Sequence, residues 1–200
     1  MTESAFDWTQ RYREGKIPWD SGKPSSELLR VVDAGIVAPC RALELGCGTG
    51  TNAVFLAQRG FDVTAVDLVE LAVEKARAKA TQAGVKVNFA CASVLDLPNL
   101  GAPFEFIFDR GCFHSFKERG WSEFLASLTR VTRSGTRWLM LCGNDKEPQD
   151  PGPPTLSEKQ IRDTLTPMFE VEWLREFRFD LSPSFGPGRP LAWSVMLRRR

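Results

Sequence analysis

The chain has 200 residues, of which 42% are hydrophobic and 26% are charged, which fits one globular domain with a substantial core and leaves little room for a second. Lysine and arginine total 26 and aspartate and glutamate total 25, so the formal net charge is +1. A chain with this balance has no broad positive field to attract DNA or RNA, and we expect no nucleic-acid partner.

No apolar run approaches the roughly 20 residues that a bilayer-spanning helix requires, and the N-terminus lacks the basic-then-apolar order of a secretory signal. We therefore expect a cytoplasmic protein without a membrane partner. The five cysteines form no C-x-x-C motif, which favours reduced thiols over a disulfide framework. A single histidine cannot build a His-rich metal centre, and the cysteine spacing matches no zinc pattern, so we assign no metal.

After residue 40, strand-like apolar runs alternate with helix-like runs, which is typical of an α/β protein with a mostly parallel sheet covered on both faces. The predicted strands span residues 41–45, 61–66, 85–90, 104–108, 137–142, part of 169–179, and 191–197. The predicted helices begin at residues 51, 70, 121 and 157. We expect one domain over residues 1–200, with an N-terminal cap (1–35) on a core (36–200).

Two of these helices carry clear sequence signals. One apolar stripe at helical spacing runs through Trp121, Phe124, Leu125, Leu128 and Val131. Gly135 is predicted to end that helix, and Ser157 with Gln160 has the form of a capping box that opens the last one. The basic run at 198–200 is expected to be a frayed, solvated tail.

The stretch ALELGCGTG, residues 42–50, joins a predicted strand to a predicted helix through three glycines. The free backbone donors of a helix N-terminus, approached closely at glycine, suit either a dinucleotide or S-adenosylmethionine. The dinucleotide fingerprint G-x-G-x-x-G would need a glycine where Thr51 stands. Glu44, two residues before the first glycine, suits a cationic ligand, and Asp67 at the end of the second strand is placed to bind ribose hydroxyls.

The pattern E-x-G-x-G-x-G, with an acid closing the second strand, resembles the class I S-adenosylmethionine-dependent methyltransferases along nearly the whole chain. The resemblance implies a Rossmann-like, seven-stranded sheet of order 3-2-1-4-5-7-6 whose seventh strand is antiparallel. It also implies that S-adenosylmethionine, and its product S-adenosylhomocysteine, contact Glu44, Gly46, Cys47, Gly48, Gly50, Asn52, Asp67, Leu68, Ser93 and Val94. Ser93 departs from the family pattern, which often has Asp for the adenine amino group, and Asp96 is the alternative.

The N-terminal segment holds Trp8, Tyr12 and Trp19, and the sequence after the fourth strand reads Asp-Arg-Gly. Both features resemble the thiopurine S-methyltransferase-like group, which includes tellurite-resistance, halide and thiol methyltransferases. The resemblance implies that the aromatics close over the cofactor, with Asp109 and Arg110 among its binding residues. Trp8 and Tyr12 share one face of a short helix, so three rings can converge near a sulfonium. The alternative is that the rings only cover the sheet edge.

His114, the only histidine, follows the Asp-Arg-Gly tripeptide at the carboxyl end of the fourth strand, where open parallel sheets bind substrates. It is a candidate catalytic base for a hydroxyl, thiol or ring nitrogen, and a structural or substrate-shaping role is the alternative. Apolar walls of the substrate site are expected from Phe6, Phe113, Phe116 and Phe185.

The segment DRGCFH contains no proline, unlike the D/N/S-P-P-Y/F/W motif of nucleic-acid amino-methyltransferases. Together with the near-neutral charge, this favours a small-molecule acceptor whose N, S or O atom attacks the methyl group in line, in a monomer or weak homodimer. Two rival hypotheses are a regulatory protein that binds S-adenosylmethionine without transferring the methyl group, and a nicotinamide oxidoreductase, which Thr51 disfavours.

Overall fold

The computed structural model describes residues 7–117, 120–148, 154–182 and 189–200. Its strands are β1 (Arg41–Leu45), β2 (Asp62–Asp67), β3 (Asn88–Cys91), β4 (Phe104–Arg110), β5 (Thr132–Asn144), β6 (Thr155–Leu156), β7 (Phe169–Arg178) and β8 (Leu191–Arg199). Its helices are α1 (Trp8–Glu14), α2 (Ser26–Asp33), α3 (Thr51–Gln58), α4 (Glu70–Gln82), the 3-10 helix η1 (Phe113–Phe116), α5 (Trp121–Val131) and α6 (Glu158–Leu165).

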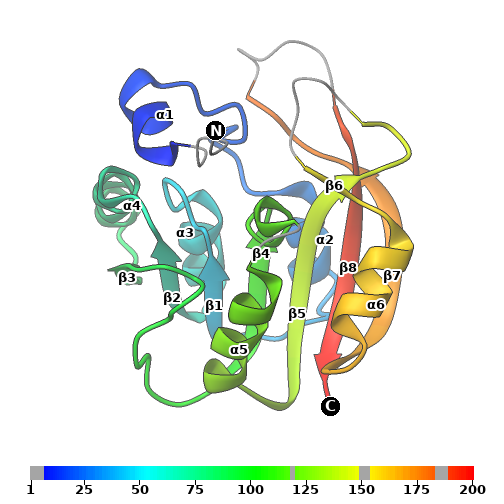
Figure 1. Ribbon diagram of the computed structural model, residues 1–200. Coiled ribbons are helices and arrows are strands. Elements are labelled where there is room, and N and C mark those ends of the chain that lie inside the picture. The colour runs from blue at the N-terminus through cyan, green and yellow to red at the C-terminus, as the bar shows by residue number, and fades with distance from the viewer. Residues whose placement is uncertain (1–6, 118–119, 149–153, 183–188) are drawn as a thin grey trace.

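The strands form one mixed sheet in the order β3-β2-β1-β4-β5-β8-β7, and β8 is antiparallel to both of its neighbours (Figure 1). The predicted fold class and the predicted order of seven strands are confirmed along this path. An eighth strand was not predicted, because the two residues of β6 follow a Pro- and Gly-rich loop and pair with the end of β5.

The two faces of the sheet carry separate apolar clusters. Helices α5 and α6 pack on one face, and α2 and α3 pack on the other (Figure 1). In β1, Leu43 and Leu45 belong to the first cluster and Ala42 to the second. Because side chains alternate along a strand, Glu44 points toward α3, which is where the glycine loop leads the chain.

Helix α2 packs in this core. Its Leu28 and Val31 are fully buried in the cluster that α3 also joins. Helix α1 lies above the carboxyl ends of β1 and β2 (Figure 1), and the division into a cap (1–35) and a core (36–200) remains a prediction. We call residues 8–25 the cover segment.

Several predicted boundaries are wrong in informative ways. Helix α5 ends at Val131, and Gly135, with φ of 88°, lies inside β5 rather than at a helix end. β3 begins at Asn88 and not at residue 85, because the residues that pair with β2 are 88–91. Arg198 and Arg199 are not a frayed tail, since both belong to β8. The predicted capping box is confirmed by reciprocal bonds at the start of α6.

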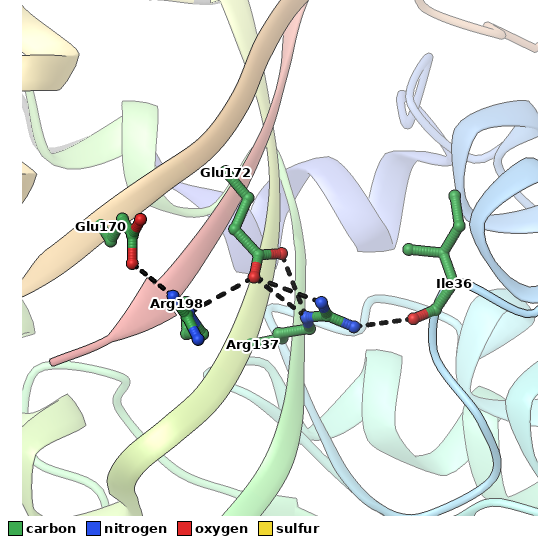
Figure 2. A network of polar contacts seen from close by, with 5 residues as sticks. All are labelled: Ile36, Arg137, Glu170, Glu172 and Arg198. Atoms are coloured by element: carbon green, nitrogen blue, oxygen red, sulfur yellow. Dashed lines mark hydrogen bonds and ion pairs between the residues drawn. The ribbon is translucent and has the colours of Figure 1, made fainter.

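A β-bulge in β7 places one carboxylate between two arginines (Figure 2). Arg137 of β5 and Arg198 of β8 are direct cross-strand partners, an arrangement that like charges make unfavourable. Glu172 is the extra residue of the bulge, and its carboxylate lies 3.0 Å from Arg137 Nε and 3.5 Å from Arg198 Nε. Arg137 also donates to the Ile36 carbonyl, and Glu170 pairs with Arg198. The bulge thus neutralises a like-charge pair.

We expect Glu172→Gln to lower the free energy of unfolding by about 1 kcal/mol, because two facing arginines lose their shared counter-charge. Glu170→Gln is the matched control, since its pair with Arg198 is half exposed on both sides and should contribute less than about 0.5 kcal/mol. Urea unfolding at low and high salt measures both values. Equal losses in the two variants would contradict the role given to the bulge.

Gly50, the third glycine of the loop, is required by helix packing. It precedes α3 with φ of 76°, and a Cβ at this position would lie 2.7 Å from the Ala76 Cβ of α4 and 3.2 Å from the Phe89 ring. Both the left-handed conformation and the close approach of α4 therefore exclude a side chain.

Gly50→Ala should destabilise the protein by about 2 kcal/mol or more, since backbone strain and a steric overlap act together. Gly84→Ala is the control, because Gly84 has a similar φ of 66° with open space around it. That variant should lose about 1 kcal/mol, from backbone strain alone. Thermal and urea unfolding compare them, and indistinguishable losses would show that α4 can move away from the loop.

Candidate functional site

The glycine loop passes through a narrow space at the carboxyl end of β1. Gly46 and Gly48 have φ of 62° and 54°, which is the left-handed region. A Cβ at Gly46 would lie 3.0 Å from the Cys112 Cβ, and a Cβ at Gly48 would lie 2.8 Å from the Tyr12 hydroxyl. The loop backbone is therefore open to close approach only because both residues are glycine.

Asp67 holds this loop from the end of β2. Its carboxylate accepts the Gly48 N–H at 2.8 Å and the Val69 N–H at 3.0 Å. The side chain is buried, and burial raises the pKa of the carboxyl above its ordinary value, against the effect of the backbone N–H groups. Each carboxylate oxygen can accept more than one hydrogen bond, so Asp67 keeps acceptor capacity for a ligand's hydroxyls.

Glu44 carries a buried oxygen without a partner. Its Oε1 accepts Asn52 Nδ2 at 3.2 Å, whereas Oε2 has no hydrogen-bond partner. Glu44 is only 2% exposed, and burial raises its pKa to about 8. A buried carboxylate with a free oxygen is costly unless a cation or donor satisfies it. The ammonium group of S-adenosylmethionine is a group of this kind, so the residues present fit the cofactor.

A cavity lies between the glycine loop and the cover segment. It is lined by Trp19, Asp20, Ser21, Lys23, Glu44, Gly46, Cys47, Gly48, Thr49, Thr51, Asn52 and Arg110. Seven of the predicted cofactor residues meet here, from the cover segment, β1, the loop, α3 and β4. The remaining predicted residues lie outside this lining.

The three aromatic residues of the cover segment converge as predicted. The Trp8 and Trp19 ring centres are 5.3 Å apart, and those of Tyr12 and Trp19 are 6.1 Å apart, both edge to face. Trp19 Nε1 donates to the Tyr12 hydroxyl at 3.3 Å. Of the three, only Trp19 lines the cavity, and Tyr12 is buried against α4 through Val69 and Ala72. Trp8 and Tyr12 thus support Trp19.

Sequence reasoning missed the bonds that fasten the cover segment to the loop. The Thr49 hydroxyl donates to the Asp20 carboxylate at 2.6 Å, and Lys79 of α4 donates to both Thr49 and Thr51 at 2.6 Å. The Ser25 N–H donates to Asn52 Oδ1 at 2.9 Å. No spacing in the sequence signals these contacts, because their partners are 27 to 30 residues apart.

Arg110 connects the cover segment to the chain that follows β7. Its guanidinium donates to the Trp19 carbonyl at 2.8 Å and to the Asp180 carbonyl, and it lies over the Phe179 ring. The Ser182 N–H also donates to the Pro18 carbonyl at 2.9 Å. Arg110 thus lines the cavity, together with Lys23, and anchors the cover segment.

Asp109, predicted to contact the cofactor, does not line the cavity. It is fully buried, and its carboxylate accepts the N–H groups of Cys112 at 2.7 Å and Phe113 at 3.1 Å. Burial raises its pKa to about 7, while these N–H groups act in the opposite direction. Asp109 therefore holds the start of η1 in place.

The residues predicted to contact adenine, Leu68, Ser93 and Val94, follow the ends of β2 and β3 and lie outside the cavity lining. Leu68 is 62% exposed, which is unusual for a large apolar residue, and Val94 is buried. The Ser93 hydroxyl accepts the Leu95 N–H at 3.2 Å, so it shapes a turn. The alternative Asp96 pairs with Arg130 at 3.0 Å on the surface. An adenine contact by this group remains a prediction.

His114 lies behind the loop that follows β4. Its Nδ1 accepts the Gly143 N–H of β5 at 2.9 Å. The ring is 5% exposed, and burial, with a smaller effect of the Arg110 charge, lowers its pKa to about 4. His114 is therefore neutral at physiological pH, with its proton on Nε2. It does not line the cavity, and this geometry favours the alternatives to a catalytic base.

The predicted apolar walls are largely core. Phe113 is 1% exposed and stacks on Trp121, and Phe116 packs against the same cluster. Phe6 and Phe185 lie outside the described residues. Within the described ranges, no group of three or more His, Cys, Asp or Glu side chains could hold a metal ion. No helix there has the length and apolar character needed to cross a membrane.

Comparison with known proteins identifies the family of the chain. The thiopurine S-methyltransferase family model matches residues 3–186. The chain is 26% identical over 195 residues to 2-heptyl-1-hydroxyquinolin-4(1H)-one methyltransferase of Mycobacteroides abscessus, covering 92% of this chain and 82% of that protein. It is 36% identical over 76 residues to probable thiol methyltransferase 2 of Arabidopsis thaliana, covering 38% of this chain and 34% of that protein.

Solved structures share the fold. One, from work on the conversion of a disulfide bond into a thioacetal group during echinomycin biosynthesis, superposes with a TM-score of 0.86 and 26% identity, covering 98% of this chain and 92% of that chain. TehB from Haemophilus influenzae superposes with a TM-score of 0.66 and 21% identity, covering 86% and 62%. The chain therefore belongs to the thiopurine S-methyltransferase family, and it is an S-adenosylmethionine-dependent methyltransferase.

Proposed function

We propose that this methyltransferase acts on a small molecule that presents an N, S or O nucleophile. The observation that carries the proposal is the fastening of the cover segment, whose residues 18–20 and 25 bond to Ser182, Arg110, Thr49 and Asn52. A site covered in this way favours a small acceptor over a folded macromolecule. The net charge of +1 also gives no support for a nucleic-acid substrate.

The predicted cofactor residues, inside the cavity and beside it, would divide the binding of the cofactor among them. Glu44 Oε2 accepts the ammonium group, and Asp67 accepts the ribose hydroxyls from the other side of the loop. Trp19 places an aromatic ring near the sulfonium, and Leu68 with Val94 provides apolar contact for adenine. When bound, S-adenosylmethionine supplies a methyl group on a positively charged sulfur.

The protein accelerates transfer mainly by alignment. Holding a nucleophile within about 3 to 3.5 Å of a near-attack carbon contributes about 7 to 11 kcal/mol. Arg110 sets this geometry indirectly, because it fixes Trp19 on one side and the end of β7 on the other. The closed cover segment also keeps water away from the reacting methyl group.

Methyl transfer is tested with radiolabelled S-adenosylmethionine and a panel of thiols, N-hydroxy heterocycles and nitrogen heterocycles. We expect labelled product and S-adenosylhomocysteine with at least one acceptor of the panel. Binding of S-adenosylhomocysteine by calorimetry with no transfer to any member would contradict the proposed class of acceptor.

Glu44→Gln should weaken S-adenosylhomocysteine binding about 10- to 100-fold near pH 7, because the ammonium loses a charged partner. The free wild-type carboxyl has a pKa of about 8, so binding a cation releases a proton below that pH, and affinity falls as the pH is lowered. The Gln variant has no such proton to release.

Calorimetry at about pH 6 and pH 7.5, in buffers of different ionisation enthalpy, measures both affinity and proton release. Glu74→Gln, on the exposed face of α4, is the control and should bind as the wild type does. A wild-type pH dependence that persists in Glu44→Gln would assign the proton to another group.

Trp19→Leu should lower the affinity for S-adenosylmethionine more than the affinity for S-adenosylhomocysteine. A cation near an aromatic face gains about 0.5 to 2 kcal/mol, so the affinity for S-adenosylmethionine should fall by about 3- to 30-fold. S-adenosylhomocysteine has a neutral sulfur and should lose less. Calorimetry with both ligands gives the ratio, and equal losses would show that Trp19 acts only as packing.

A further inference from the structure

We propose that Lys23 binds the carboxylate at the amino-acid end of S-adenosylmethionine, so that the bound cofactor joins the cover segment to β1. The inference rests on the cofactor placement proposed above, in which Glu44 accepts the ammonium group at the same end. Lys23 belongs to the cover segment and lines the cavity, whereas Glu44 belongs to β1. The cofactor's own zwitterion is then one of the connections that hold the cover segment in place.

The cavity beside the glycine loop matches the amino-acid end of the cofactor. Glu44 and Asn52 line it together with the glycine backbone. Asp67 and Leu68, which we propose for ribose and adenine, lie outside this lining. The part of the cofactor that the cavity takes is therefore the part that carries one ammonium group and one carboxylate.

Two acids line this cavity, and one of them keeps an oxygen without a partner. Both oxygens of Asp20 are engaged, because they accept the Thr49 hydroxyl at 2.6 Å and the Gly22 N–H at 3.1 Å. Glu44 Oε2 is the oxygen without a hydrogen-bond partner. The acid that is available to the ammonium group is therefore Glu44.

Two cations line the same cavity, and they differ in the same way. The Arg110 guanidinium donates to the carbonyls of Trp19 and Asp180. Lys23 bonds only through its backbone, to the Ser21 hydroxyl, and its ammonium group has no hydrogen bond or ion pair among residues 7–117, 120–148, 154–182 and 189–200. Lys23 thus keeps three N–H donors and a positive charge for a ligand.

A tight turn holds the backbone of Lys23 at the cavity wall. Gly22, with φ of 69°, donates its N–H to Asp20 Oδ1 at 3.1 Å. The Ser21 hydroxyl accepts the Lys23 N–H at 3.3 Å and donates to the Lys23 carbonyl at 3.0 Å. Because the backbone is already placed, a ligand has to order only the side chain, which lowers the entropic cost of the contact.

Lys23 and Glu44 line one cavity from two parts of the fold and form no ion pair with each other. An amino acid carries its ammonium group and its carboxylate on the same carbon, so one ligand can contact both residues. Each contact is a charge-assisted hydrogen bond, which is stronger than a bond between neutral groups. The bound cofactor thus adds an ionic connection to the hydrogen bonds of Asp20 and Trp19 that already hold the cover segment.

The first test measures two ligands by calorimetry: S-adenosylhomocysteine, and S-adenosyl-3-thiopropylamine, which keeps the ammonium group but lacks the carboxylate. Lys23 is exposed, so Lys23→Gln should weaken S-adenosylhomocysteine by about 3- to 20-fold, between the effect of a surface ion pair and that of a buried one. The same change should not weaken S-adenosyl-3-thiopropylamine, which offers Lys23 no anion. Lys23→Arg keeps the cation and should retain most of the affinity for S-adenosylhomocysteine.

Lys16→Gln is the matched control, because Lys16 is an exposed cation of the same segment that pairs with Glu14 outside the cavity lining. It should bind both ligands as the wild type does. Equal weakening of both ligands by Lys23→Gln, equal losses in the two Gln variants, or wild-type affinity in Lys23→Gln would each overturn the proposal. If S-adenosyl-3-thiopropylamine binds too weakly to measure, the comparison of Lys16→Gln, Lys23→Gln and Lys23→Arg decides the question.

The second test follows hydrogen exchange in the cover segment with each ligand at saturation. S-adenosylhomocysteine should slow exchange there about 3-fold or more beyond S-adenosyl-3-thiopropylamine, because only the zwitterion joins the segment to β1. In Lys23→Gln the two ligands should protect the segment equally. Equal protection in the wild type would overturn the proposal.

These measurements need no methyl acceptor, so they are separate from the test of the proposed function. Absence of transfer to every acceptor, with the effects of Lys23→Gln present, would contradict the proposed class of acceptor and support the role of Lys23. A loss of affinity in Lys23→Gln with wild-type affinity in Glu44→Gln would place the ammonium group elsewhere, and it would overturn the connection to β1.

Discussion

The hydrogen bond from the Gly48 N–H to the Asp67 carboxylate is the contact on which this site depends. It joins the loop after β1 to the end of β2, the two strands that meet at the centre of the parallel half of the sheet. This bond holds the backbone of the glycine loop against the carboxyl end of β2. The loop then lies between Glu44 on one side and Asp67 on the other.

Three buried carboxyls lie near the ends of neighbouring strands, and they have different roles because their hydrogen-bond partners differ. Asp109 is satisfied by backbone N–H groups and serves the fold. Asp67 accepts two backbone N–H groups of the loop and keeps acceptor capacity for the ligand that we propose. Glu44 keeps one oxygen unpaired, and we propose that this oxygen binds a cation. Burial raises the pKa of all three carboxyls. The three differ in the number of hydrogen-bond donors that each carboxyl receives from the protein.

The fold and the cofactor loop could be predicted from the sequence because they depend on local signals. Apolar runs, capping residues and the glycine spacing act over a few residues, and the strand order followed from the resemblance that Glu44 and Asp67 supported. The bulge at Glu172, the bond between Thr49 and Asp20, and the tautomer of His114 could not be predicted. Each depends on two distant segments meeting, and neither partner alone has an unusual neighbourhood in the sequence.

Helix α1 and the C-terminal end of β8 lie at opposite edges of the molecule (Figure 1). The C-terminal arginines continue β8 and bond to the carbonyls of Thr166 and Met168, far from the glycine loop. The first described helix lies directly over that loop. An affinity handle or fluorescent fusion attached after Arg200 is therefore held away from the glycine loop and its cover segment.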